Sequence, residues 1–513
     1  MLLFFLFSCR SIPKGDTSQP DIILVSIDTL RADHVSSYGY ERKTTPFIDS
    51  LASKGMRFSH AWSTSSWTLP AHTSLLSGTR SLQHKVIEES IPIPNDLPLI
   101  SETLQNSGWQ TGGVVSASFV SRLYGFDRGF DFFEDFGLDG DANKNLQAEI
   151  SAEHIIARAL DWMKGSSIEA GKPTFLFLHF YDAHYECDPP APFDEMFDRK
   201  HSESDINYKN YFYHKETPLT KDELNHQIAQ YDEAIRYVDH HLQRLQRIWK
   251  EAGRDAIWIV TSDHGEEFGE RGSWGHAHTL YKEQVHIPLI VSPTKAIKVE
   301  HQHVGIEDIA STIGEIAGVE FKGSGISLLE LQNSKRRNFV FETSRFYSNR
   351  LAILSDEYKL EWDVVKNTTE LFHITTDFKE KYPIEKDQIS LELQQSILSY
   401  IGNNWKTKTT GTITSKKGYF FIPRSTKEKD IQPIQTLHIN QGDSFQVIPF
   451  DSNVRFQPKY SSNIFGPFRE MGSKQPNEND PLELAQERMT TSDVELSEEI
   501  QNQLKILGYM TEE

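Results

Sequence analysis

Residues 21–28 read DIILVSID, a short apolar run enclosed by two aspartates. A run this rich in branched apolar residues, without polar alternation, is typical of a strand that is buried on both faces. Comparable runs are TGGVVSA (111–117), TFLFLHFYD (174–182), AIWIVTSD (256–263) and HIPLIVS (286–292). Segments with helical periodicity separate these runs. The alternation predicts an α/β fold in which helices flank a large, mostly parallel central sheet.

The ends of two of these helices can be read from the sequence. Thr45 and Pro46 open the segment PFIDSLASK and Gly55 closes it, as the preferences for N-cap, N1 and C′ residues require. A longer helix is predicted from Thr220 to Gly253, because T-K-D-E forms a capping box and apolar residues follow at helical spacing. We interpret these apolar residues as core: Leu224, Ile228, Tyr231, Ile235, Val238, Leu242 and Leu245.

Antiparallel signals follow residue 335, where short β-like runs alternate with polar turns. The first runs predict a hairpin, NRLAILSDEYKLEWD (349–363), with its turn around Ser355 and Asp356. The elements expected after the hairpin are a strand at 369–374, a helix at 389–400, β-like runs at 418–424 and 444–450, and a helix at 496–509.

Charge limits the partners that this protein can have. The chain has 513 residues, with 53 Lys and Arg against 73 Asp and Glu, and a formal net charge of -20. An acidic surface repels polyanions, so we expect no nucleic-acid partner. An anionic substrate must therefore be held locally, most simply by a cation.

The two cysteines have different interpretations. Cys9 and Cys187 cannot build a disulfide framework, so the fold depends on packing. The start MLLFFLFSC resembles a bacterial lipobox, in which cleavage before the cysteine precedes its lipidation. We expect a cell-envelope protein, outward-facing or periplasmic, that meets the membrane only through a lipid anchor on Cys9; the alternative is a frayed apolar N-terminus. Cys187 is expected to be an unpaired thiol without a catalytic role.

Polar residues follow three of the predicted strands where they end. Asp28 ends the first run, Asp182 and His184 follow TFLFLHFYD, and Asp263 and His264 follow AIWIVTSD. Ligands bind at the carboxyl ends of parallel strands, and carboxylates with an imidazole suit one divalent cation, either Ca, Mg or Mn, with Zn not excluded. Each residue alone could equally be a loop residue that caps a helix.

Five segments together resemble the catalytic domain of the sulfatase family, within the alkaline phosphatase superfamily. In chain order they are DIILVSIDTLRADHVSSYGY, TTPFIDSLASKGMRF, SSWTLPAHTSLLSGT, SDHGEEFGE and WGHAHTLYKEQVHIPLIV, all within residues 21–291. The resemblance implies the sulfatase fold and a metal-dependent enzyme that acts on an anionic ester. RLAILSDEYKLEWD and ELFHITTD resemble the family's smaller C-terminal subdomain, and LKILGY its final helix.

The resemblance also divides the chain into expected parts. These are a signal and tether at 1–20, the catalytic α/β domain at 21–335, an antiparallel β subdomain at 336–404, and a β-rich accessory region with a terminal helix at 405–513.

Carried over residue by residue, the resemblance makes Asp28, Asp263 and His264 metal ligands and places Thr68 at the nucleophile position. Sulfatases have C-x-P-x-R there and convert the cysteine to formylglycine, whereas this chain reads Thr68-Leu69-Pro70-Ala71-His72. Both the modifiable cysteine and the arginine are absent, so formylglycine cannot form. The other departures are Thr29 for the usual second aspartate, and Ser116 and Ser118 for a lysine and a histidine.

A threonine at this position can still act as a nucleophile. We expect Pro70 to be the N1 residue of a helix, so that Thr68 lies at a helix N-terminus, where negative charge is stabilised. A cation there would lower the pKa of the hydroxyl. A formylglycine hydrate releases sulfate by collapsing to an aldehyde, but threonine must be freed by attack on the transferred group. The sequence therefore favours phosphate esters.

Five histidines need separate interpretations. His184, in Y-D-A-H-Y, resembles a family histidine near the leaving group, and His276 or His278 lies where sulfatases often bind substrate. Imidazole suits proton donation near neutral pH. His72 occupies the position of the missing arginine, either to bind substrate or simply as a helix residue. His179 lies within an apolar strand and is expected to be a satisfied core residue.

Three hypotheses remain open at this point. The first is an enzyme that forms a covalent Thr68 intermediate and passes the group to water or to another hydroxyl, with phosphoesters favoured. The second is a sulfuric ester hydrolase that works without formylglycine. The third, from a different class, is a catalytically silent binding protein that keeps the fold and the metal.

Overall fold

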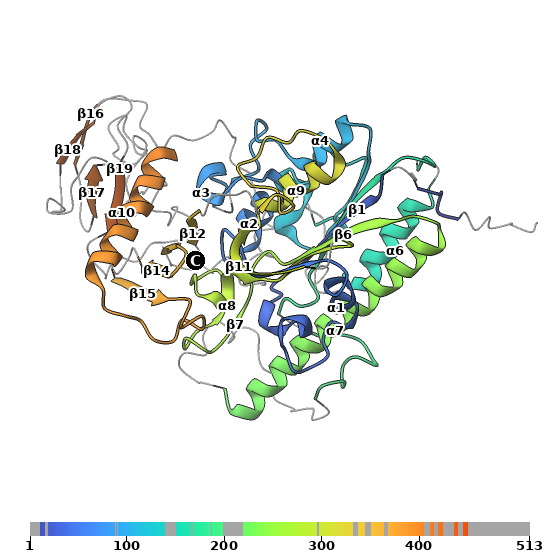
Figure 1. The fold of residues 1–513 in the computed structure, drawn as a ribbon, viewed down its shortest axis with the longest axis horizontal. Coiled ribbons are helices and arrows are strands. Elements are labelled where there is room, and N and C mark those ends of the chain that lie inside the picture. Colours follow the sequence, from blue (N-terminus) through green and yellow to red (C-terminus); the bar gives the residue numbers. More distant parts are fainter. Residues whose placement is uncertain are drawn as a thin grey trace, which may run out of the picture.

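Figure 1 shows the computed structural model of the protein. It describes residues 11–404 apart from internal gaps, together with four strands between residues 411 and 449. The gaps are 16–18, 88, 90, 139–149, 166–167, 186, 199–218, 295–296, 332–336, 344–349 and 364–367. Cys9 and the helix expected at 496–509 lie outside the described residues. Among the described helices, none is both long enough and apolar enough to cross a membrane.

A nine-stranded sheet forms the centre of the structure, with β1 (Asp21–Ile27) inside it. β1 runs parallel to β5 (Thr174–Phe180) on one side and to β6 (Ala256–Thr261) on the other. The remaining strands are β2 (Met56–Trp62), β3 (Gln110–Val114), β4 (Phe132–Glu134), β9 (His286–Ile287), β10 (Leu289–Ser292) and β11 (Ile297–Gly305). The order is β11-β2-β10-β6-β1-β5-β3-β4, with β9 paired to β2. β9 and β10 run antiparallel to their neighbours, so the sheet is mixed but mostly parallel, which confirms the predicted fold class.

Alternate residues of β1 face two different hydrophobic cores. Ile22 and Leu24 belong to one core, and Ile23 and Val25 belong to the other. The first core includes residues of α2 (Thr68–Ser77), α4 (Ile100–Asn106) and α9 (Asp308–Ala317), and the second includes residues of α1 (Pro46–Ala52), α6 (Ala152–Met163) and α7 (Lys221–Glu251). Figure 1 shows these two helical layers on opposite sides of β1 and β6. Each fully buried aliphatic side chain contributes roughly 1.5–3 kcal/mol, so β1 is well fixed.

The two helix ends read from the sequence have different outcomes. α7 begins with the predicted capping box, in which the Thr220 hydroxyl accepts from Glu223 N at 3.3 Å. α1 begins at Pro46 as predicted, but its C-cap is Ser53 and not a glycine at C′. Gly55 has another role, because a Cβ there would lie 2.2 Å from the Val291 carbonyl oxygen. The glycine allows close approach of two chain segments and does not end the helix.

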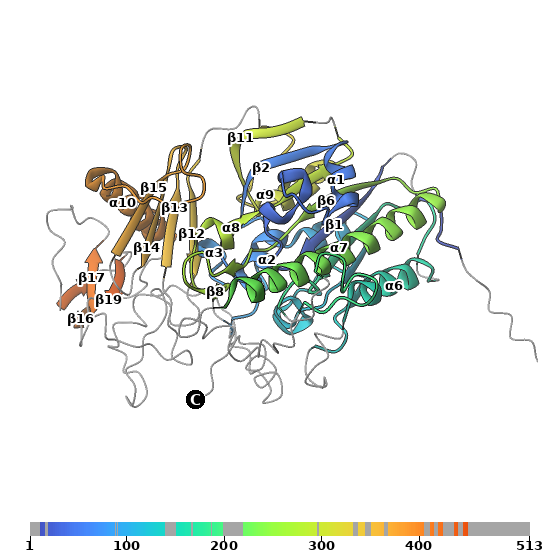
Figure 2. The same cartoon turned by 90° about the horizontal axis from the view of Figure 1, so that it is seen from below.

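A second, four-stranded antiparallel sheet lies beside the main one (Figure 2). Its strands, in order, are β12 (Phe339–Thr343), β13 (Arg350–Leu354), β14 (Tyr358–Asp363) and β15 (Thr368–His373). The predicted hairpin is present as β13 and β14, and Ser355 N donates to Tyr358 O at 2.8 Å in its turn. α10 (Asp387–Asn404) packs against this hairpin. The antiparallel subdomain predicted from the sequence is therefore present in the fold.

The two sheets share a hydrophobic core. Trp62 at the end of β2 and Leu280 from the main domain are buried with Phe341 and Leu354 of the smaller sheet. Beyond α10, β16 (Gly411–Thr414) pairs with β18 (Thr436–Ile439) and β17 (Tyr419–Pro423) pairs with β19 (Phe445–Pro449). The runs predicted at 418–424 and 444–450 correspond to β17 and β19.

Candidate active site

The ends of β1 and β6 bring three predicted metal ligands together. Asp28 follows β1 directly, and Asp263 and His264 follow β6, its parallel neighbour. One ligand atom from each residue lies within 4.8 Å of the others, and all three residues are buried. The topology of the parallel sheet thus places the three side chains at one edge, where such folds bind their ligands.

Three of the four carboxylate oxygens of this cluster lack a hydrogen-bond partner among the described residues. Both Oδ atoms of Asp28 and the Oδ2 atom of Asp263 are buried and make no hydrogen bond within the described part of the chain. A buried acceptor without a partner costs about 1–3 kcal/mol, and more when it is charged. Burial also raises the pKa of Asp28 to about 7. Two carboxylates and an imidazole that converge in this way fit a divalent cation, which would supply the missing partner.

The tautomer of His264 suits a ligand. Its Nδ1 lies 2.9 Å from the Gly265 carbonyl oxygen, which can only accept, so Nδ1 carries the proton. Nε2 is then the nitrogen that faces the carboxylates, 3.2 Å from Asp263 Oδ2 and 3.7 Å from Asp28 Oδ1. A hydrogen bond on one ring nitrogen commonly orients the other toward a metal.

Thr68 lies beside the same imidazole. Its hydroxyl oxygen is 3.4 Å from His264 Nε2, so the hydroxyl and the Asp263 carboxylate approach the same nitrogen. Thr68 is the first residue of α2, and the N-cap residue Trp67 makes no side-chain cap. The prediction that Pro70 is N1 was wrong, because Pro70 is the third residue of the helix. The placement of Thr68 at a helix N-terminus holds, and the helix dipole favours negative charge there.

His72 lies one turn further along α2 and contacts the backbone of Thr68. Its Nδ1 donates to Thr68 O at 3.0 Å and lies 3.5 Å from Asp263 Oδ2. Its Nε2 is 3.0 Å from the Ser26 hydroxyl on β1. Burial lowers the pKa of His72 to about 3, so the ring is neutral. These contacts orient the start of α2, and Ser26 is a supporting residue that the sequence did not reveal.

His179 differs from its prediction. It is buried in β5 as expected, but Nε2 lies 3.3 Å from Asp28 Oδ2 and neither ring nitrogen makes a hydrogen bond within the described residues. It therefore lies beside the cluster of Asp28, Asp263 and His264 and is not a satisfied core residue. Strand alternation carried a signal for this, because His179 pairs in register with Ser26 and shares a sheet face with Phe177, which belongs to the core on the α2 side.

Thr29 orients the cluster without adding a carboxylate to it. It adopts a left-handed backbone conformation with φ of 57°. Its N–H donates to Asp263 Oδ1 at 3.3 Å, and its hydroxyl donates to Ala183 O at 2.9 Å. The Tyr231 hydroxyl donates to Thr29 O at 2.8 Å. Tyr231 was interpreted as core alone, but it also holds this turn in place.

Of the three candidate acid–base histidines, His276 lies beside His264, and His184 lies beside His276. The His276 ring centroid is 4.5 Å from that of His264 and 4.9 Å from that of His184. Glu266 holds His276, with its Oε2 at 3.2 Å from Nδ1. Burial and the neighbouring His276 lower the pKa of His184 well below its usual value. The structure therefore brings His184 and His276 to the cluster.

His278 has different surroundings. Its Nδ1 donates to His276 O at 2.8 Å, and its Nε2 lies 3.6 Å from the buried carboxylate of Glu267. Burial lowers its pKa, but the attraction of Glu267 outweighs burial, so the net pKa is raised. His278 is thus tied to Glu267, and its contacts point to a supporting position behind His276.

Residues of the smaller sheet support the loop that carries His276. The Thr343 hydroxyl at the end of β12 donates to Ala277 O at 3.0 Å, and Ala277 N donates to Ser66 O at 2.9 Å. The neighbouring Glu342 N donates to Thr64 O at 3.2 Å. These bonds connect β12 to the segment that leads into Thr68.

The remaining predicted positions lie outside the cluster. Asp182 caps α6, where it accepts from Ala152 N at 2.8 Å. Ser116 joins two strand ends, since its hydroxyl donates to His179 O at 3.1 Å, and Ser118 begins a short 3-10 turn. Cys187 is a free cysteine, as predicted, and burial raises the pKa of its thiol.

Comparison with known proteins finds similarity to sulfatases. The family model of sulfatases matches residues 20–319. An N-acetylglucosamine-6-O-sulfatase from Bacteroides thetaiotaomicron is 22% identical, with 73% of this chain and 82% of the relative covered. An arylsulfatase from Clostridium perfringens is also 22% identical, with 71% and 89% covered.

Among solved structures, a phosphonate monoester hydrolase of Agrobacterium radiobacter has the same fold, with a TM-score of 0.58 and 17% identity. The alignment covers 74% of this chain and 95% of that structure. The stretch that the family model matches is more than half of the chain and includes Asp28, Thr68, Asp263 and His264. The chain therefore belongs to the sulfatase family of ester hydrolases, within the alkaline phosphatase superfamily.

Proposed function

We propose that the protein is a metal-dependent enzyme that transfers a phosphoryl or sulfuryl group from an anionic ester through a covalent intermediate on Thr68, with phosphoesters favoured. The observation that carries this proposal is the position of the Thr68 hydroxyl, buried and 3.4 Å from His264 Nε2. A hydroxyl at a helix N-terminus, beside carboxylates without partners, is placed to attack an anionic group.

The metal site belongs to the same proposal. Asp28, Asp263 and His264 would hold one divalent cation, of which Ca, Mg and Mn suit an oxygen-rich set and Zn also accepts an imidazole. When bound, the ion would lower the pKa of the Thr68 hydroxyl and neutralise negative charge on the transferred group.

The chain's own residues account for two displacements. In the first, the Thr68 hydroxyl gives its proton to a neutral imidazole of the His184–His276 pair, a bond forms between Thr68 Oγ1 and the phosphorus or sulfur atom, and the ester bond to the leaving oxygen breaks. The charged pair then gives a proton to the departing oxygen, which imidazole does well when suitably placed. In the second, water or another hydroxyl gives its proton to the pair and attacks the transferred group, the bond to Thr68 breaks, and the pair returns the proton to Thr68.

Threonine chemistry is the reason for favouring phosphate over sulfate. A threonine ester has no second hydroxyl and cannot collapse to an aldehyde, so the bound group must be removed by direct in-line attack. Phosphoryl groups undergo such displacement when charge is well neutralised. The likeness to a phosphonate monoester hydrolase is compatible with this, whereas the sulfatases among the relatives support the alternative, a sulfuric ester hydrolase.

Substitution of the nucleophile tests the function. Thr68→Ala should lower kcat by several orders of magnitude with nearly unchanged metal content, because the hydroxyl forms the intermediate but is not a principal ligand. Thr68→Ser keeps a hydroxyl and should retain measurable turnover. The assay compares aryl sulfate, aryl phosphate and aryl phosphodiester, with metal measured by elemental analysis. Near wild-type activity of Thr68→Ala, or loss of its metal, would contradict the role of Thr68. Sulfate esters cleaved faster than every phosphoester would favour the alternative.

We also propose that Cys9 carries a lipid that holds the enzyme in the cell envelope. The support is the lipobox-like sequence Leu6-Phe7-Ser8-Cys9. In the polar stretch that follows it, Ile12 packs in the second hydrophobic core. Metabolic labelling with a fatty acid in a bacterial host should mark the wild type and not Cys9→Ala. Cys187→Ala is the matched control and should label like the wild type. Equal labelling of all three proteins, or of none, would count against the anchor.

A further inference from the structure

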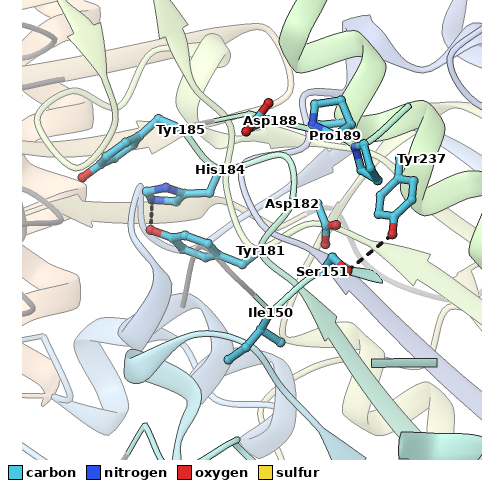
Figure 3. Close-up of a pocket in the computed structure, with 11 residues that line it drawn as sticks. Ile150, Ser151, Tyr181, Asp182, His184, Tyr185, Asp188, Pro189 and Tyr237 are labelled. Atoms are coloured by element: carbon cyan, nitrogen blue, oxygen red, sulfur yellow. Dashed lines mark hydrogen bonds between the residues drawn. The ribbon is translucent and has the colours of Figure 1, made fainter. Parts of the chain in front are cut away.

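A cavity of about 50 Å³ lies beside His184 and has no role in the steps above (Figure 3). The loop after β5, the start of α6 and the side of α7 form its wall. A cavity of this size holds a few water-sized groups. The lining residues that matter here are Tyr181, Asp182, His184, Tyr185, Asp188 and Tyr237.

Asp182 offers this cavity an unused acceptor. Its Oδ1 atom accepts from Ala152 N at 2.8 Å and so caps α6. Its Oδ2 atom is buried and makes no hydrogen bond within the described residues. Figure 3 shows this carboxylate close to the Tyr237–Ser151 pair, whose hydroxyl oxygens are 3.4 Å apart. A shielded carboxylate oxygen with no partner calls for a donor from a ligand, preferably a charged one.

The rest of the lining favours a cation. Asp188 adds a second, exposed carboxylate, and Tyr181, Tyr185 and Tyr237 provide aromatic rings. Among the described residues that line the cavity, there is no lysine or arginine. Carboxylates combined with aromatic faces attract ammonium groups more strongly than neutral hydroxyls, since both the charge and the ring quadrupole contribute.

His184 connects the cavity to the reacting centre. Its ring lines the cavity, stacks on Tyr181 at a centroid distance of 4.1 Å, and lies 4.9 Å from the ring of His276. A group held in the cavity is therefore adjacent to the histidines that we assign to the leaving oxygen. The part of a substrate that reaches this position is its alcohol.

We propose that the cavity binds an ammonium group on the leaving alcohol, so that the enzyme prefers esters of amino alcohols. This inference rests on the proposed function, because it names the alcohol portion of that substrate. It does not depend on whether the transferred group is phosphoryl or sulfuryl.

The test compares three alcohols of similar size in the metal-loaded enzyme. The 2-aminoethyl, 2-hydroxyethyl and propyl esters of both phosphate and sulfate are assayed for kcat/KM. The aminoethyl ester should exceed the other two by about tenfold or more, the usual effect of a hydrogen bond to a charged group. A preference for the hydroxyethyl ester, or none among the three, would overturn the inference while leaving ester hydrolysis intact.

Substitution of Asp182 tests whether its carboxylate causes the preference for the aminoethyl ester. Asp182→Asn keeps an oxygen for Ala152 N but removes the charge, and should lower the aminoethyl-to-propyl ratio about tenfold with little change for the propyl ester. Asp239→Asn is the control, since Asp239 is a buried carboxylate that caps α1 through Phe47 N at 3.0 Å and Ile48 N at 2.9 Å. It should keep the wild-type ratio. A preserved ratio in Asp182→Asn would exclude this carboxylate as the ammonium site.

A binding measurement separates this inference from the proposed function. Titration calorimetry of metal-loaded Thr68→Ala with 2-aminoethyl phosphate and with propyl phosphate requires no turnover. Tighter binding of the aminoethyl compound, lost in Thr68→Ala/Asp182→Asn, supports the cavity even if no ester is cleaved. Equal binding of the two compounds rejects it.

Discussion

Asp28 is a residue whose charge the described chain does not balance. Neither of its carboxylate oxygens has a hydrogen-bond partner there, and burial raises its pKa to about 7. An unfolded aspartate has a pKa near 3.9, so the metal-free folded protein binds more protons than the unfolded chain between about pH 4 and 7. Stability without metal therefore falls as pH rises through this window, by roughly 3–4 kcal/mol in total. The residue is suited to the metal-loaded state and destabilises the metal-free one.

Asp28→Asn should consequently act in opposite directions with and without metal. At pH 8 with a chelator, the variant should unfold at higher denaturant than the wild type, because the buried charge is gone. With a divalent cation present, it should show weaker metal binding and a smaller gain in stability. Asp135→Asn is the control, because Asp135 already pairs with Arg122 at 2.9 Å and its loss should destabilise both states. A chelated Asp28→Asn protein less stable than the wild type would contradict this account.

The sequence predicted the centre of the site but not the residues around it. Asp28, Asp263 and His264 follow buried strands, but so does Asp182, which lies outside the cluster. The resemblance to sulfatases was needed to select the three ligands. Ser26 and His179 act from inside strands, and their convergence depends on which sheet face each occupies, which requires the register between β1 and β5. Tyr231 lies in a row of apolar residues at helical spacing, which explains its assignment to the core. Nothing in the sequence indicates that its hydroxyl donates to Thr29 O.

At the scale of elements, prediction succeeded where burial is complete. β1, β5 and β6 are continuous apolar runs because both faces are covered. β2 and β11 were not predicted, since MRFSHAW and IKVEHQHVG mix apolar with polar residues. β11 lies at the end of the sheet order, and an edge strand needs less apolar cover. Local sequence therefore reveals the middle of this sheet better than its margin.

The junction between α1 and β2 provides a prediction about packing. Gly55→Ala should cost about 1–3 kcal/mol or more, because its Cβ would lie 2.2 Å from the Val291 carbonyl oxygen and β10 would have to shift. Gly253→Ala, after α7, is the comparison: φ there is 69°, but no atom lies within 4 Å of the added carbon. It should cost only about 1–2 kcal/mol of backbone strain. Urea unfolding of the metal-loaded proteins measures both, and a larger loss for Gly253→Ala would refute the packing argument.

At the scale of the whole molecule, buried histidines set the response to acid. Burial lowers the pKa of His84 and of His286 to about 3. Burial keeps both rings neutral. His84 Nδ1 also accepts from Val86 N at 3.0 Å, which a protonated Nδ1 could not do, whereas the donation from His286 Nε2 to Ser59 O at 2.8 Å opposes the effect of burial only in part. The unfolded chain protonates histidine near pH 6.5. Stability is therefore lost as pH falls below about 6.5, and each such histidine contributes up to about 1.4 kcal/mol per pH unit.

Removal of one such histidine should reduce this acid sensitivity. The free energy of unfolding of the metal-free protein, measured between pH 6 and 4, should fall less steeply in His286→Gln than in the wild type, by about one proton in slope. His154→Gln, at an exposed position on α6, controls for the substitution itself. An unchanged slope in His286→Gln would mean that other groups dominate the acid response.

The hydrogen bonds from β12 to the loops around Thr68 and His276 make the two sheets depend on each other. Thr343 and Glu342 belong to the smaller sheet, yet they hold Ala277 and Thr64 in the main domain. A chain cut at residue 335 would lose these bonds and expose the core that Trp62 shares with Phe341. We therefore expect neither sheet of this protein to keep its structure when it is expressed without the other. The candidate active site thus depends on both sheets and not on the main domain alone.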